Sequence, residues 1–206
     1  MRDELIGVYL ERLAAREPTP GGGAAAALHA GQAAALVAMV ARYTTGPKYA
    51  EHSEAVARIT ERADSLSEQA LGLASADEAA FGKVASAYKL ARDTEEAKAA
   101  RSVAIAEATA GAAQPPAEVI GVAQEIIELA ETLLPIGNRN VITDIAAAVE
   151  AARAAATTSR VNIEINLGQV EDPERRAELQ NIAVKVDTLS SSVEKITAQV
   201  REVISQ

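Results

Sequence analysis

The chain has 206 residues, of which 49% are hydrophobic, so it holds enough apolar material for a well-packed core. One Phe and four Tyr are its only aromatic residues, and Cys is absent. These counts exclude a disulfide scaffold, a thiol nucleophile and a Cys-ligated zinc site, and they favour close-packed helices over aromatic-rich strands. The net charge of −9 argues against nucleic acid as a partner, because its phosphate backbone would be repelled.

Breaker residues divide the chain into predicted helices. A short opening helix over residues 3–15 is followed by helical segments over 23–45, 49–90, from about 94, 115–135, 143–166 and from 172 onward. Gly and Pro stand at most of these boundaries, where they end one helix or start the next. The pattern predicts an all-α, single-domain bundle of about six helices over residues 1–206, with long helices packed nearly antiparallel.

The Ala-rich segment 24–41 carries no Lys, Arg, Asp or Glu, which raises the question of a membrane span. Ala is only weakly hydrophobic, whereas a span needs about 20 strongly apolar residues. We therefore expect a buried helix here and no membrane partner. The charged start of the chain lacks the pattern of a signal peptide, so we expect a cytoplasmic location.

The last predicted helix carries apolar residues from Leu179 to Val203 at alternating spacings of three and four. Such a seam indicates packing along a nearly parallel or antiparallel neighbour, or a contact between subunits if it is exposed. Together with the stripe of small residues over 148–162, this seam predicts more apolar helix surface than a narrow bundle needs. We therefore expect a homodimer.

Segment 49–90 has a similar seam, but Asp77 occupies a position where the pattern requires a hydrophobic residue. Loss of hydration raises the pKa of a carboxyl on a buried face, which suits a general acid or base. Phe81 and Tyr88 lie beside the same stripe. The alternative interpretation is an Asp that pairs with an Arg or caps a break in the backbone.

Two other features are typical of ligand sites. Gly21, Gly22 and Gly23 precede a predicted helix, and free N–H groups at such a start can hold an anion or a carbonyl. The sequence is neither a Walker A loop nor a dinucleotide fingerprint. Asn162 and Asn166 lie one turn apart on one helix face, where paired amides can hold a planar heterocycle or instead satisfy each other or a helix end.

Four groups of residues occur in a characteristic order between about residues 18 and 168. They are Pro20-Gly21-Gly22-Gly23 before an Ala-rich helix ending at Arg42 and followed by Tyr49; Asp77-Glu-Ala-Ala-Phe81 with Tyr88-Lys89-Leu90; Gly137-Asn138 with Thr143-Asp144; and Asn162-Ile-Glu-Ile-Asn166-Leu167. This ordered set resembles the folate cyclodeaminase/cyclohydrolase family. One departure is Ala24, which stands where a Ser is expected.

The resemblance implies an all-α domain, usually dimeric, that acts on the one-carbon unit bridging N5 and N10 of tetrahydrofolate. In the cyclodeaminase reaction N10 attacks the formimino carbon and ammonia leaves; in the cyclohydrolase reaction water opens the methenyl bridge to give 10-formyltetrahydrofolate. The sequence does not separate these two activities. No metal or bound cofactor is required, because the substrate carries the one-carbon unit. A non-catalytic bundle that binds folate or a partner is the alternative.

The resemblance also implies roles for individual residues. Asp77 would be the acid/base. The substrate-binding residues would comprise the glycine turn (Gly21, Gly22, Gly23), the aromatic Phe81 and Tyr88, and the polar Asn138, Asp144, Asn162 and Asn166. Arg42, Lys48 and Lys89 are the candidate cations for the anionic glutamate tail of folate.

Overall fold

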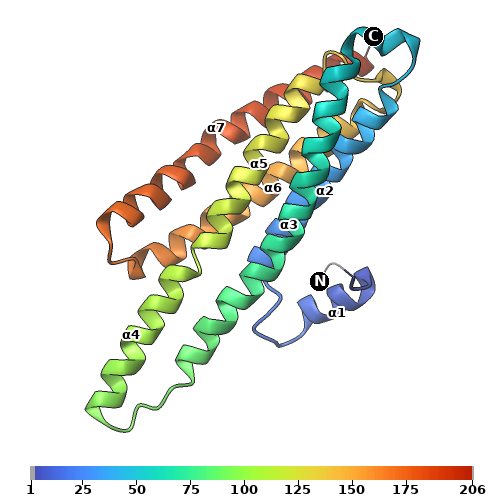
Figure 1. Cartoon of the computed structure of the whole chain (residues 1–206). Coiled ribbons are helices and arrows are strands. Elements are labelled where there is room, and N and C mark those ends of the chain that lie inside the picture. Colours follow the sequence, from blue (N-terminus) through green and yellow to red (C-terminus); the bar gives the residue numbers. More distant parts are fainter. Residues whose placement is uncertain (1–2, 206) are drawn as a thin grey trace.

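The computed structural model describes residues 3–205, and within them the regular elements are helices, with no β-strand (Figure 1). A nine-residue helix, α1 (Ile6–Ala14), precedes six longer ones: α2 (Gly22–Tyr43), α3 (Ser53–Tyr88), α4 (Glu95–Gly111), α5 (Gln114–Leu133), α6 (Thr143–Asn166) and α7 (Pro173–Ile204). Short 3₁₀ turns lie at η1 (Pro47–His52), η2 (Arg139–Val141) and η3 (Leu167–Gln169). The predicted all-α bundle of long helices is confirmed.

Helix α2 is the core of the bundle and packs against α3, α5 and α6. Its Ala and Val side chains are almost all buried, and small side chains let the neighbouring helix backbones approach closely. By length and composition α2 could cross a membrane, but most of it is buried inside this structure. It therefore has the properties expected of an apolar core helix.

Long-range ion pairs and hydrogen bonds show that α2 runs antiparallel to both α3 and α6. The end of α2 reaches the early part of α3 through Arg42 and Asp64, and reaches the loop before α6 through Tyr43 and Asn138. The start of α2 consequently lies beside the last third of α3 and the end of α6. Residues from three distant parts of the sequence meet at that end of the bundle.

The apolar seam of α7 is buried within the chain rather than exposed for a second subunit. Leu179, Val186, Val193 and Ile196 are each at most 1% exposed, and α7 packs on α5 and α6. Closing the seam inside the bundle lets its side chains interdigitate with those of α6 over most of the helix length. The seam therefore supplies no interface for a homodimer.

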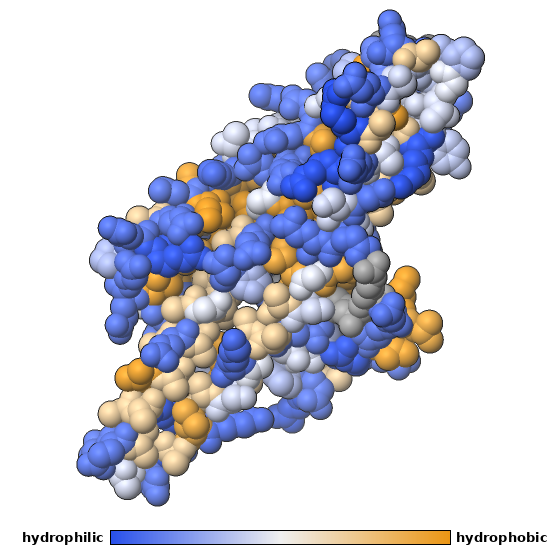
Figure 2. Space-filling view, viewed as in Figure 1, coloured by the Kyte–Doolittle hydropathy of each residue, from blue (hydrophilic) through white to orange (hydrophobic). Residues whose placement is uncertain are grey.

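Two parts of the fold extend away from this core (Figure 1). The end of α3 and all of α4 form a projecting helical hairpin, and α4 has no buried residue. Helix α1 lies beside the bundle, and Tyr9 is its one buried residue. Hydrophobic side chains remain exposed on both parts, as the orange surfaces in Figure 2 show.

Candidate active site

Asp77 from α3 lies at the N-terminus of α2. Helix α2 begins after Gly21, whose backbone is extended and which has no side chain to cap the helix. The N–H of Ala24, in the first turn of α2, instead donates a hydrogen bond to the Asp77 carboxylate. A residue on a neighbouring helix thus satisfies an N–H group that a local Ser or Thr usually satisfies.

Gly23 allows the carboxylate to come this close. A Cβ atom added at Gly23 would lie 2.0 Å from Asp77 Oδ1 and 2.4 Å from its Cγ. No side chain fits there unless Asp77 or the helix start moves. By contrast, a Cβ atom at Gly21 or Gly22 would meet nothing within 4 Å, so the steric requirement for glycine applies to the third position of the turn.

The surroundings of Asp77 raise its pKa above the ordinary value for aspartate. Desolvation by burial is the largest cause, and the negative charge of Glu78 acts in the same direction. The hydrogen bond from Ala24 lowers the pKa, but burial outweighs it. The prediction of a half-buried carboxyl with a raised pKa, made from the interrupted seam, is in agreement with this environment.

A cavity of about 190 Å³ opens beside Asp77. It brings together several of the predicted site residues with side chains that the sequence did not single out for a site: Pro18, Thr19, Gly21, Gly22, Gly23, Asp77, Phe81, Val84, Ala112, Pro116, Asn162, Ile165 and Asn166. Ligand pockets usually measure about 300–1,000 Å³, so this cavity has room for part of a drug-sized ligand rather than for the whole of one. Its walls are largely apolar, and its polar side chains are Thr19, Asp77, Asn162 and Asn166.

The two asparagines reach the cavity from the last turns of α6. Asn162 Nδ2 donates to the Thr158 carbonyl at 3.0 Å, and Asn166 Nδ2 donates to the Asn162 carbonyl at 2.8 Å. These bonds occupy part of the donor capacity of each amide and leave both side-chain oxygens as acceptors for ligand N–H groups. The Asn166 side chain thus bonds to the backbone of Asn162, whereas no hydrogen bond is found between the two amide groups in the described residues.

Tyr88 and Lys89 lie further along α3, outside the cavity. At 1.5 Å per residue they are roughly 17 Å beyond Asp77 along the helix. Tyr88 is exposed, its ring lies 5.4 Å from the Arg101 guanidinium, and its carbonyl accepts hydrogen bonds from the same side chain. The structure therefore places this pair on the projecting hairpin rather than around Asp77.

The other predicted site residues lie at the opposite end of the bundle. Arg42 follows Gly23 by 19 residues of α2, which corresponds to roughly 30 Å. Arg42 pairs with Asp64, and Lys48 lies over the Tyr49 ring. Asn138 joins helix ends: its side chain donates to the Tyr43 carbonyl at 2.8 Å, and its N–H donates to Thr44 Oγ1 at 3.0 Å.

Asp144 lies near that same end, in the first turn of α6. A larger hollow of about 600 Å³ lies there too, lined by residues that include Arg42, Thr44, Tyr49, Ser53 and Asp64. We take the smaller cavity as the active site, because the carboxyl with a raised pKa, the open helix start and the two amides converge only on it among the cavities of the described residues.

Several lining residues were missed by sequence reasoning. Pro18 and Thr19 belong to the segment between α1 and α2, while Ala112 and Pro116 flank the junction of α4 and α5. The prolines were recognised only as helix breakers. Helix-breaking residues place chain reversals at the ends of a bundle, which is where this cavity opens. The positions of these prolines therefore indicate which end of the bundle they occupy, but they do not by themselves indicate a ligand site.

The fold and the cavity define a helical bundle with a small cavity beside a partly buried carboxyl whose pKa is raised. The sequence model described as formiminotransferase-cyclodeaminase matches residues 5–185. The chain belongs to this family, as its ordered motifs predicted.

Individual relatives agree with this assignment. A methenyltetrahydrofolate cyclohydrolase from Methylorubrum extorquens is 36% identical over 93% of this chain and 94% of its own length. The formimidoyltransferase-cyclodeaminase of Rattus norvegicus is 28% identical over 82% of this chain, which spans 32% of that longer protein. The crystal structure of a formiminotetrahydrofolate cyclodeaminase from Thermotoga maritima superposes with a TM-score of 0.82 at 27% identity, covering 99% of this chain and 97% of that one.

Proposed function

We propose that the protein is a folate enzyme that acts on the one-carbon unit between N5 and N10 of tetrahydrofolate, and that it hydrolyses the methenyl bridge. The observation that carries the proposal is the carboxyl of Asp77, whose pKa is raised beside an open helix start and two amides. The 36% identity with a methenyltetrahydrofolate cyclohydrolase over nearly the whole chain favours hydrolysis over deamination.

The proposed chemistry follows from the charge of the substrate. The methenyl bridge carries a positive charge shared by N5 and N10, so an ionised Asp77 attracts it in a partly desolvated cavity. Asp77 removes a proton from water as the water oxygen bonds to the bridging carbon. The resulting carbinolamine collapses when the C–N5 bond breaks, N5 gains a proton and the hydroxyl proton is lost, which leaves a formyl group on N10. One proton is released overall.

The neighbouring groups have separate tasks in this proposal. The side-chain oxygens of Asn162 and Asn166 accept N–H groups of the pterin, and Phe81 covers one apolar part of the ring system. Gly22 and Gly23 let the ligand approach the first N–H groups of α2, which favour the negative charge that develops on the carbinolamine oxygen as its hydroxyl proton is lost. The reaction needs no bound cofactor, because the substrate carries the carbon that reacts.

Two assays test the proposal. The protein is mixed with 5,10-methenyltetrahydrofolate, and the near-ultraviolet absorbance of the bridge is followed against a buffer blank; ammonia release from formiminotetrahydrofolate is measured separately. We expect faster loss of absorbance than in the blank and no ammonia. Ammonia release would identify a cyclodeaminase instead. Rates equal to the blank in both assays would leave a non-catalytic folate-binding bundle.

We also propose a homodimer, on grounds other than the α7 seam. Exposed hydrophobic side chains gather on α1 and on the projecting α3–α4 hairpin (Figure 2): Leu5, Ile6, Val8, Leu10, Phe81, Tyr88, Leu90 and Val103. Apolar surface of this kind is typical of a subunit contact, and a stable one buries on the order of 1,000 Å² or more.

A second copy would also explain the split between the predicted site residues. Arg42 and Lys48 lie roughly 30 Å from Gly23 along the same chain, so they reach a folate bound at Asp77 only from another subunit. Mixing two inactive variants, Asp77→Asn and Arg42→Gln, tests this. Shared sites in a twofold dimer would restore about a quarter of wild-type turnover, because half the dimers are mixed and each has one intact site. Unshared sites would restore nothing beyond the sum of the two variants.

A further inference from the structure

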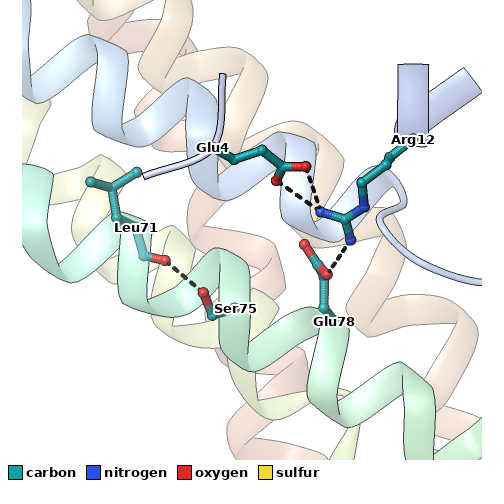
Figure 3. Close-up of polar contacts among 5 residues, drawn as sticks. All are labelled: Glu4, Arg12, Leu71, Ser75 and Glu78. Atoms are coloured by element: carbon teal, nitrogen blue, oxygen red, sulfur yellow. Dashed lines mark hydrogen bonds and ion pairs between the residues drawn. The ribbon is translucent and has the colours of Figure 1, made fainter. Parts of the chain in front are cut away.

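Helix α1 is attached to the bundle by few contacts, and a charged one is central among them. Arg12 Nη1 donates to both carboxylate oxygens of Glu4, at 2.8 and 3.0 Å, and Arg12 Nη2 donates to Glu78 Oε2 at 3.0 Å (Figure 3). The guanidinium thus joins the start of the chain to α3. The Tyr9 ring, buried against the bundle, is the apolar part of the attachment.

The carboxylate that Arg12 holds is the sequence neighbour of Asp77. Successive side chains on a helix point in different directions, so Asp77 faces the start of α2 while Glu78 faces α1. Their charges still interact, since Glu78 raises the pKa of Asp77. Arg12 is therefore a counterion for the carboxylate that opposes ionisation of Asp77.

Among the ion pairs of the described residues, the one that reaches this pair of carboxyls comes from Arg12. The titratable groups facing it are Glu4, Tyr9 and Arg12, all from α1 or the residues before it. The other elements that line the described cavity contribute glycines, asparagines and apolar side chains, and none of these groups titrates. The balance of charge at Asp77 consequently depends on one arginine from a different helix.

Two polar atoms of this cluster are buried, although the Arg12 side chain itself is 41% exposed. Tyr9 Oη and Glu78 Oε1 are both buried and have no hydrogen-bond partner within the described residues. Burial raises the pKa of Tyr9, with smaller contributions from Glu78 and Glu4, so the phenol remains protonated beside these carboxylates. Partly desolvated charges interact more strongly than fully hydrated ones, and the exposure of Arg12 makes its effect on the two carboxylates dependent on salt.

We propose that Arg12 is a positioning residue: by pairing with Glu78, it makes Asp77 the carboxyl of the adjacent pair that exchanges a proton with the substrate. Its catalytic meaning rests on the proposed function. Without the guanidinium, two neighbouring carboxylates would compete for one proton, and the proton would be spread over the pair. Helix α1 then has a task in the site although none of its residues lines the cavity.

The proposal is tested by titrating Asp77 directly, using NMR of protein labelled with ¹³C at the Asp carboxyl carbons. The Asp77 signal is assigned by its loss in Asp77→Asn. Arg12→Gln should raise the pKa of Asp77 further at low ionic strength, because the charge of Glu78 loses its counterion. Glu78→Gln should lower it. Arg12→Gln added to Glu78→Gln should have a smaller effect than in the wild type, since without the Glu78 charge the guanidinium is held less firmly beside Asp77.

Two further variants separate charge from structure. Arg12→Lys keeps the charge and should restore most of the shift, whereas a role in docking α1 alone would not be rescued in this way. Arg62→Gln removes a comparable surface ion pair, with Glu125, and should leave the titration unchanged. If Arg12→Gln leaves the pKa of Asp77 unchanged, or lowers it because α1 detaches and water reaches the carboxyl, the proposal is wrong.

The activity measurement is kept separate from the titration. If the wild type hydrolyses the methenyl bridge, the acidic limb of its pH–rate profile should move in the same direction as the titration in each variant. If the titrations behave as expected but no folate turns over, the proposed function fails while the control of the Asp77 proton by Arg12 stands.

Discussion

Replacement of Gly23 by alanine is the most direct test of the site geometry. The new Cβ atom would lie 2.0 Å from Asp77 Oδ1, whereas ordinary contacts begin at 3.4 Å, so the carboxylate must move by about 1.4 Å or the start of α2 must shift. A misplacement of about 1 Å costs roughly 100-fold in rate when it affects a reacting group. We therefore expect Gly23→Ala to lose at least that factor in turnover.

The fold should survive the same change. The weakened hydrogen bond from Ala24 to a charged carboxylate costs about 1.5–3 kcal/mol, and alanine in a helix regains about 0.5–1 kcal/mol over glycine. The net loss of about 1–2 kcal/mol is measurable by urea unfolding without unfolding the protein. Gly72→Ala is the matched control, because it lies on the exposed face of α3 with nothing within 4 Å of an added Cβ. It should keep wild-type turnover and gain stability.

The assay is the loss of methenyltetrahydrofolate absorbance, measured with circular dichroism of each variant. In an Asp77→Asn background, Gly23→Ala should cause little further loss of turnover, because the group it displaces is already inactive. Wild-type turnover in a folded Gly23→Ala protein would refute the reasoning. So would full additivity of the two losses.

The remaining predictions concern the activity and stability of an Asp77 variant, the role of Asn166 and the oligomeric state. Asp77→Asn should remain folded and lose about 10²–10⁴-fold in turnover with a smaller loss of folate binding. Because the pKa of Asp77 is higher in the folded than in the unfolded protein, the contribution of Asp77 to stability is largest below the unfolded pKa and declines as pH rises through the folded pKa. Asp77→Asn should therefore be more stable than the wild type at neutral pH. Urea unfolding should show that this gain in stability becomes smaller in acid. Asn166→Ala should raise KM more than it lowers kcat, whereas Asn181→Ala, on the exposed face of α7, should change neither. Light scattering at micromolar concentration should report about twice the 21.4 kDa chain mass, and a 21.4 kDa particle would exclude the homodimer.

The sequence was sufficient for the helices and for the central carboxyl. Gly and Pro define most helix boundaries through local backbone geometry, which needs no tertiary contact. The interruption of a hydrophobic seam identified Asp77 for the same reason: the period of a helix shows which of its faces is buried. The family was also readable, since its short motifs keep their order along the chain.

The tertiary structure decided which of these features meet. Helix periodicity does not indicate which neighbour covers an apolar face, so the sequence of α7 is compatible with an internal contact and with a subunit contact. In the structure, α5 and α6 cover the α7 seam. Nor does sequence order give distance across a bundle. Antiparallel packing brings Gly23, Asp77 and Asn162 to one end and sends Arg42 and Asn138 to the other.

The contact between Arg12 and Glu78 could not be predicted either. The two residues are 66 positions apart; Arg12 belongs to no periodic pattern or motif, and the motif that contains Glu78 does not indicate which side chain it contacts. Local sequence fixes the conformation of each helix, because backbone hydrogen bonds and side-chain periodicity act within a few residues. The charges that surround Asp77 depend instead on how separate helices pack, and only the folded chain determines that.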